Sequence, residues 1–141
     1  MNGEIQLLEK PRQEATPAKV LFVCTANIQR SLTAEHLFRS LFSNVIFKSA
    51  GVSRRECARN NSQLCTIELL DWADQVFVFE QKHLDRIIQH TGEQFLSKIS
   101  NLEIDDNYQY MQPELVEELK KKFYLCLPES SSIPAKVIPL S

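Results

Sequence analysis

The sequence predicts an α/β fold, a single doubly wound sandwich with a four-stranded parallel sheet in the order 2-1-3-4 and helices on both faces. Its length of 141 residues suits one domain. Its composition, 43% apolar and 24% charged residues, is typical of a globular chain. Short apolar runs alternate with segments of helical periodicity, and strands that alternate with helices pair in parallel through right-handed crossovers.

The first strand is predicted at Lys19–Cys24, an apolar run of branched and aromatic residues that suits a strand buried on both faces. A polar loop follows through Arg30, and the pattern becomes helical after Ser31. Apolar residues recur there on one helix face. They are Ala34, Leu37, Phe38, Leu41 and Phe42. Val45–Ala50 indicates the second strand, closed by Gly51.

Three arginines follow in what we expect to be a loop: Arg54, Arg55 and Arg59. We interpret them as a solvated face, with a substrate clamp as the alternative. The next helix is indicated by apolar residues spaced by three, at Leu64, Ile67 and Leu70.

The second half of the chain repeats the alternation. Asp74–Phe79 is predicted as the third strand, and the helix after it ends at Gly92. A fourth strand is expected within residues 98–104. Pro113 opens the last helix at a position where its missing N–H costs nothing. The apolar faces of the two helices comprise Leu84, Ile87 and Ile88, and Leu115, Val116, Leu119 and Phe123.

The folded domain is expected to cover residues 19–126. Residues 1–18 are polar, contain two prolines and show no periodicity, so we expect a flexible leader without the pattern of a signal peptide. Residues 127–141 are expected to form a tail.

Charge and composition exclude several classes of protein. A net charge of -2 argues against a nucleic-acid binder. No apolar run approaches the roughly 20 residues needed to span a membrane. The four cysteines are too few for a disulfide scaffold and show no C-x-x-C spacing, which favours a reducing, cytoplasmic location. Three of them are expected to be structural: Cys57, Cys65 and Cys126.

Ligands of doubly wound sheets bind beyond the carboxyl ends of the strands, so the loop after the first strand is the first candidate site. It reads Cys24-Thr-Ala-Asn-Ile-Gln-Arg30-Ser31, that is, a cysteine, five residues, an arginine and a hydroxyl. Composition predicts about 0.02 chance occurrences of this pattern in the chain, so it is specific.

The physical chemistry of this loop favours a thiolate nucleophile and a bound phosphate. Successive backbone N–H groups converge on one point, and the helix N-terminus adds about half a positive charge. Arg30 can fork to two phosphate oxygens, Ser31 is placed to donate to the Cys24 sulfur, and Asn27 tolerates a left-handed backbone. The phosphate-binding residues are therefore expected to be Thr25, Ala26, Asn27, Ile28, Gln29, Arg30 and Ser31. The alternative is that Cys24 is a core residue.

The segment Val20–Ser31 resembles the signature of the low-molecular-weight protein tyrosine phosphatase family, in particular its short bacterial members. Three further stretches are similar to that family: 49–51, 72–84 and 105–116. The resemblance extends from Lys19 to Leu125.

The resemblance implies hydrolysis of a phosphotyrosine protein or a small aryl phosphate through a phosphocysteine on Cys24, by a monomer that needs no metal or cofactor. It assigns the general acid to Asp106, with Asp105 as a competitor one residue away. A phenolate whose conjugate acid has a pKa near 10 leaves slowly without a proton donor, which supports an acid in the site. Tyr108 and Tyr110 are expected to flank the substrate, with packing as the alternative.

Four positions depart from the family pattern. Ala26 replaces a glycine, and a positive φ there would cost roughly 1–2 kcal/mol. Gln29 replaces a second loop cysteine, so the intraloop disulfide of other members cannot form. Leu32 and Asn107 replace prolines.

Two alternative functions remain open. One is an arsenate reductase, since some arsenate reductases have a fold similar to the one predicted here. Such enzymes need further redox cysteines, in the best-known type within the segment that corresponds to residues 80–92, and that segment contains none. A phosphate- or phosphotyrosine-binding module without turnover would need neither a nucleophile at Cys24 nor an acid at Asp106.

Overall fold

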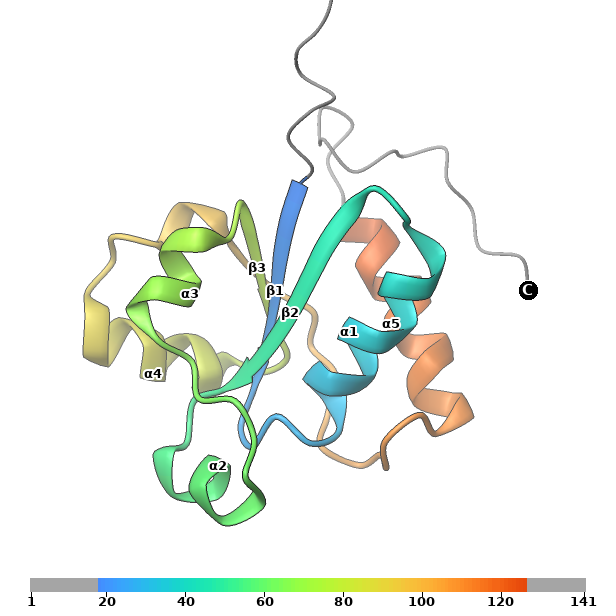
Figure 1. Ribbon diagram of the computed structural model, residues 1–141, viewed down its shortest axis with the longest axis horizontal. Helices are drawn as coiled ribbons and strands as arrows, with labels where there is room; N and C mark the ends of the chain where they lie inside the picture. The colour runs from blue at the N-terminus through green and yellow to red at the C-terminus, as the bar shows by residue number, and fades with distance from the viewer. Residues whose placement is uncertain (1–17, 127–141) are drawn as a thin grey trace, which may run out of the picture.

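The sheet has four parallel strands in the order β2-β1-β3-β4, as the sequence predicts (Figure 1). The computed structural model describes residues 18–126. The strands are β1 (Ala18–Cys24), β2 (Val45–Gly51), β3 (Gln75–Val78) and β4 (Ile99–Asn101). Since β1 lies between β2 and β3, the loop after β1 is flanked by the segments that follow both of those strands.

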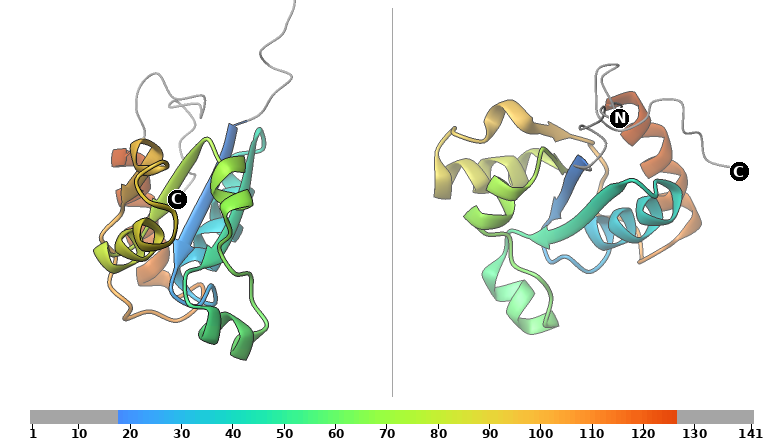
Figure 2. Two further views of the ribbon diagram at one scale, coloured as in Figure 1. Left: turned by 90° about the vertical axis from the view of Figure 1, so that its left-hand side faces the viewer. Right: turned by 45° about the horizontal axis from the view of Figure 1, so that its top comes forward.

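Helices cover both faces of this sheet. They are α1 (Arg30–Leu41), α2 (Arg54–Asn60), α3 (Ile67–Trp72), α4 (Gln81–Thr91) and α5 (Pro113–Cys126), with a short 3₁₀ turn at Leu96–Lys98. Figure 1 shows α1 and α5 on one face and α3 and α4 on the other. Figure 2 shows α2 beyond the end of the sheet where the loop after β1 lies.

The two faces of the sheet carry different cores. On the α1 and α5 side the core is aromatic and centres on Phe22, whose ring centroid lies 5.8 Å from that of Phe38 and 5.7 Å from those of Phe77 and Phe123. On the other side the core is mainly aliphatic. There, Leu21 and Val23 on β1 and Val76 and Val78 on β3 pack against α3 and α4. With both faces covered, β1 is buried along its length, as its apolar run predicts.

One predicted loop is wrong. The segment with Arg54 is the helix α2, which begins after Ser53, whose hydroxyl accepts a hydrogen bond from the Glu56 N–H at 3.1 Å. Leu64, expected in the following helix, instead forms a bridge to Gly51, and α3 begins only at Ile67.

Ala18, expected to end the leader, is the first residue of β1, and α5 ends at Cys126. The rest of the predicted leader and the predicted tail lie outside the described residues. Within residues 18–126, no helix is long and apolar enough to cross a membrane.

Candidate active site

The loop from Thr25 to Gln29 is fastened by its carbonyl groups. The carbonyl oxygens of Cys24 and Thr25 accept from the N–H groups of Val52 at 2.9 Å and Ser53 at 3.0 Å. The Ala26 carbonyl accepts from the Ser62 hydroxyl at 2.5 Å. Within residues 18–126, no group accepts a hydrogen bond from the N–H groups of residues 25–29. With the carbonyls engaged outward, these N–H groups are available to an anion, as expected for a phosphate cradle.

The backbone conformation of the loop is set at Asn27 and Gly51. Asn27 is the loop residue with a positive φ, 59°, and its side-chain oxygen accepts from the Gln63 N–H at 3.2 Å. Ala26 has no positive φ, so alanine carries no strain there. A Cβ at Gly51 would lie 2.5 Å from the Thr25 carbonyl oxygen, so glycine is needed where β2 passes the loop.

The sulfur of Cys24 lies at the end of β1, 3.0 Å from the hydroxyl oxygen of Ser31. Asn27 donates to the same hydroxyl oxygen at 2.8 Å. The hydroxyl proton of Ser31 can therefore point to the sulfur or to the Ala50 carbonyl oxygen, which is farther away at 3.4 Å. A thiolate accepts but does not donate, so this arrangement suits the negatively charged form of Cys24.

Arg30 begins α1 and is only 1% exposed, and several groups hold its side chain. Its Nη1 donates to the Glu80 carboxylate and, at 2.8 Å, to the Ile104 carbonyl oxygen. No described residue accepts from Nη2, which leaves that group free for phosphate oxygens. Burial alone would raise the pKa of Glu80, but the hydrogen bond and charge of Arg30 lower it.

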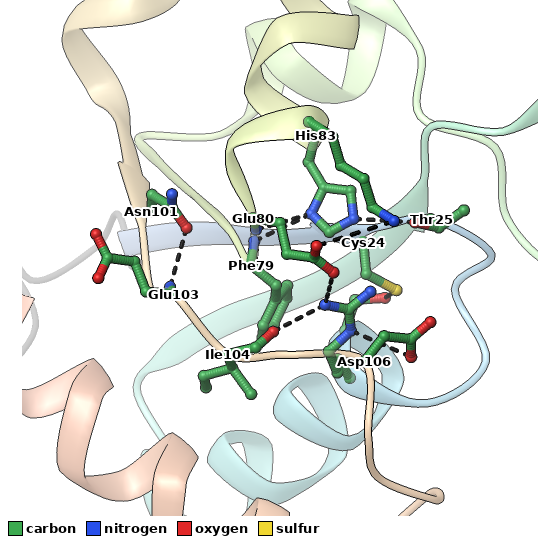
Figure 3. Close-up of polar contacts among 12 residues, drawn as sticks. Cys24, Thr25, Phe79, Glu80, His83, Asn101, Glu103, Ile104 and Asp106 are labelled. Carbon is green, nitrogen blue, oxygen red and sulfur yellow. Dashed lines mark hydrogen bonds and ion pairs between the residues drawn. The ribbon is translucent and has the colours of Figure 1, made fainter.

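Asp106 lies beside this guanidinium, with Oδ1 3.7 Å from the Arg30 Nε and its side chain 53% exposed (Figure 3). Asp105 is exposed and forms no ion pair or hydrogen bond with any residue from 18 to 126. The segment after Asp106 is tied to α1, because the Met111 N–H donates to the Thr33 hydroxyl at 2.9 Å. The structure therefore places Asp106, rather than its neighbour, next to the arginine of the loop.

The two tyrosines that follow occupy different environments. Tyr108 is half-buried and packs against the aromatic core, which favours the packing alternative. Tyr110 is exposed, and its hydroxyl lies 2.7 Å from Nδ1 of His36 on α1. A role for either ring beside a substrate stays a prediction.

His83 on α4 is fully buried, and its contacts fix its tautomer. Its Nδ1 accepts from the N–H groups of Phe79 at 3.2 Å and Glu80 at 3.1 Å, so the ring proton belongs on Nε2. Nε2 then donates to the Thr25 hydroxyl at 3.0 Å (Figure 3). Burial, with the nearby charge of Arg30, lowers the pKa of His83 to about 4, so the ring is neutral at physiological pH.

Glu80 and His83 were not among the site residues predicted from the sequence. Their contacts to Arg30 and Thr25 join positions 50 and 58 residues apart. The available signal was their place directly after the third strand, because the ends of neighbouring parallel strands lie side by side.

The other cysteines lie outside the cradle. Cys57 is buried with its sulfur 3.8 Å from the Ala26 carbonyl oxygen, behind the loop. Burial raises the pKa of Cys65 to about 12, so this thiol stays protonated. Cys126 is half-buried at the end of α5. Among the residues that the structure describes, no group of three or more His, Cys, Asp or Glu side chains has the arrangement of a metal site.

Solved structures resemble this fold. A low molecular weight protein tyrosine phosphatase from Streptococcus pyogenes has a TM-score of 0.62 and 18% identity, covering 79% of this chain and 95% of its own. The tyrosine phosphatase Wzb from Escherichia coli K30, in complex with phosphate, has a TM-score of 0.61 and 24% identity, covering 76% and 94%. The YwlE arginine phosphatase from Geobacillus stearothermophilus has a TM-score of 0.55 and 23% identity, covering 77% and 94%.

Sequence comparison gives the family. No curated protein matches the chain. The family model described as low molecular weight phosphotyrosine protein phosphatase matches residues 19–122, which include the four strands except Ala18, the loop after β1 and the segment of Asp106. The chain therefore belongs to the low molecular weight phosphotyrosine protein phosphatase family and is a cysteine-based protein phosphatase of that type.

Proposed function

We propose that the enzyme hydrolyses phosphotyrosine esters in two steps, with Cys24 as the nucleophile. The observation that carries this proposal is the position of the Cys24 sulfur, 3.0 Å from the Ser31 hydroxyl, beside a loop in which the carbonyls of Cys24, Thr25 and Ala26 accept hydrogen bonds from residues 52–62. Hydrogen bonding and loop dipoles together favour the thiolate, which is the reactive form of a cysteine.

In the first step the Cys24 thiolate attacks phosphorus in line with the departing oxygen. The S–P bond forms, the P–O bond to the phenol breaks, and protonated Asp106 gives its proton to the leaving oxygen. The loop N–H groups and Arg30 hold the equatorial oxygens, where negative charge concentrates in the transition state.

In the second step the Asp106 carboxylate takes a proton from water, and the water oxygen attacks phosphorus. The S–P bond breaks, inorganic phosphate forms, and the Cys24 thiolate is restored. Ser31 stabilises the departing sulfur by donating a hydrogen bond from its hydroxyl group, a role that the 3.0 Å contact between the two atoms supports.

Hydrolysis of p-nitrophenyl phosphate by the wild type and by Cys24→Ser tests this mechanism. We expect the variant to lose activity by at least about 10³-fold, because a serine hydroxyl at this position has no base beside it. Cys126→Ser, remote from the loop, is the matched control and should retain full activity. Rapid acid quench of the wild type should trap a phosphoryl group on Cys24. Turnover without that adduct, or substantial activity in Cys24→Ser, would refute the covalent mechanism.

The same experiments separate the alternatives. Binding of a phosphotyrosine peptide without release of phosphate would indicate a binding module. Arsenate-dependent oxidation of a thiol reductant would indicate a reductase, although α4 supplies no second cysteine. We also expect a monomeric enzyme. We expect a cytoplasmic location, since a nucleophilic thiolate needs reducing surroundings. Size-exclusion chromatography with light scattering and cell fractionation test these two expectations.

A further inference from the structure

A depression lined by α2, α4 and the segment before α3 extends away from the phosphate loop. It has three contiguous parts. The part nearest the loop, about 400 Å³, includes Thr25 and His83 in its lining, and the farthest, about 430 Å³, lies between α3 and α4. Arg86 belongs to the lining of all three parts, so they adjoin at this residue. We call this the α2–α4 groove.

The groove carries basic side chains without acidic partners. Arg54, Arg55 and Arg86 are exposed on its walls, and none of the three forms an ion pair with another residue between 18 and 126. Arg86 donates through Nε to Nε2 of His90 at 3.2 Å, a contact that orients the guanidinium and supplies no carboxylate partner.

The same lining also holds three acidic side chains, of which one is paired. Glu56 pairs with Arg59, outside the lining, at 3.5 Å. Asp85 accepts a hydrogen bond from the neutral Gln81 amide at 3.0 Å and keeps its charge, and Glu68 lies only in the farthest part. Among the described residues, three unpaired arginines therefore face two unpaired carboxylates in this lining. The whole chain carries a net charge of -2, so a surface with three unpaired arginines differs from the molecule's average.

The lining of the farthest part includes the apolar side chains Val52, Leu64 and Ile87 together with Arg54 and Arg86. A lining of apolar and basic side chains suits an extended peptide, whose side chains alternate in direction so that neighbouring residues can contact different parts of the lining. Because Thr25 belongs both to the phosphate loop and to this groove, a chain whose phosphate is bound can continue directly into it.

We propose that the α2–α4 groove binds acidic residues that flank the phosphotyrosine of a substrate protein, with Arg54 and Arg86 as their main partners. The proposal rests on the phosphotyrosine phosphatase activity proposed above and adds the substrate class. Long-range attraction to these arginines would also speed association with acidic peptides at low salt.

Two phosphotyrosine peptides of equal length test the proposal, one with glutamates and one with glutamines on both sides of the phosphotyrosine. The measured quantity is the ratio of kcat/KM for the acidic peptide to that for the neutral one. We expect a ratio of about 5–10 for the wild type at low salt, since each exposed charge pair contributes up to about a fivefold effect. The ratio should fall toward one in Arg54→Gln/Arg86→Gln and with added salt.

Lys121→Gln is the control, because it removes one positive charge from an exposed position on α5, on the opposite face of the sheet (Figure 1). It should keep the wild-type ratio.

A wild-type ratio of one, or an elevated ratio that survives loss of both arginines, overturns the proposal. If p-nitrophenyl phosphate is hydrolysed but neither peptide is, the phosphotyrosine assignment itself fails. If the wild type hydrolyses no phosphate ester in a reaction that requires Cys24, the catalytic proposal is refuted instead.

Discussion

The buried histidine of the site makes a quantitative prediction about stability and pH. The His83 ring is fully buried, accepts two backbone N–H groups and donates to Thr25, so its neutral form is stabilised and its pKa lies at about 4 instead of 6.5. As the pH falls below 6.5 the unfolded chain takes up a proton at this histidine, whereas the folded chain does so only near pH 4. Proton uptake therefore favours the unfolded state, and stability falls over this range.

The size of the effect follows from the shift. A pKa difference from 6.5 to about 4 corresponds to about 3 kcal/mol in full, and to about 2 kcal/mol between about pH 7.5 and pH 5. The lowered pKa of Glu80 affects stability only at lower pH, below the ordinary glutamate pKa of 4.5. The interval above pH 5 therefore isolates the contribution of the histidine.

Urea denaturation of the wild type and His83→Gln at the two pH values measures this contribution. Glutamine can accept and donate at similar positions but does not titrate. We expect the wild type to lose about 2 kcal/mol more than the variant on going to pH 5. His90→Gln, an exposed position on α4, controls for loss of a histidine and should behave as the wild type. If the wild type and His83→Gln lose the same stability, the histidine is not held neutral by burial, and the proton assignment on its ring is wrong.

Three further substitutions test other parts of the site. Gly51→Ala places a Cβ 2.5 Å from the Thr25 carbonyl oxygen; we expect a loss of about 1–3 kcal/mol in stability and weaker inhibition by inorganic phosphate, and normal values for both would contradict the close fit. Glu80→Gln leaves the buried Arg30 guanidinium without its carboxylate partner; an unfolding free energy lower by about 1–3 kcal/mol is expected, whereas an unchanged urea midpoint would show that the pair contributes nothing. Asp106→Asn should slow p-nitrophenyl phosphate hydrolysis by about 10²-fold or more, with little effect from Asp105→Asn; equal losses would remove the acid assignment.

The fold could be predicted where the sequence pattern is local. The apolar run of β1, the cysteine that ends it and the helix starting at Arg30 lie within one continuous stretch, so strand, loop and helix were all predictable from neighbouring residues. The helix α2 was not, because it is short and polar and buries only Cys57. Its sole local signal is the capping hydroxyl of Ser53.

The site could be predicted only in part, for a related reason. The loop residues are adjacent in sequence, but Glu80, which pairs with Arg30, and His83, which contacts Thr25, come from the segment after β3. Glu80 and His83 lie at the start of α4, where helix capping is an ordinary explanation for both residues. Only the strand order brings them to the loop after β1. The strain considered for Ala26, where the family pattern has glycine, does not arise, because the residue of the loop with a positive φ is the adjacent Asn27.

The outward carbonyls of the phosphate loop make its shape depend on a neighbouring unit. Residues 52–63, which contain α2, hold the loop through the Val52 and Ser53 N–H groups, the Ser62 hydroxyl and the Gln63 N–H. A loop held in this way has little rigidity of its own, so transient opening of residues 52–63 would disorder the surroundings of Cys24 without global unfolding. Anion occupancy and α2 folding are then thermodynamically linked. Amide hydrogen exchange across residues 52–63 should slow when phosphate binds, although the proposed anion site is formed by residues 25–31.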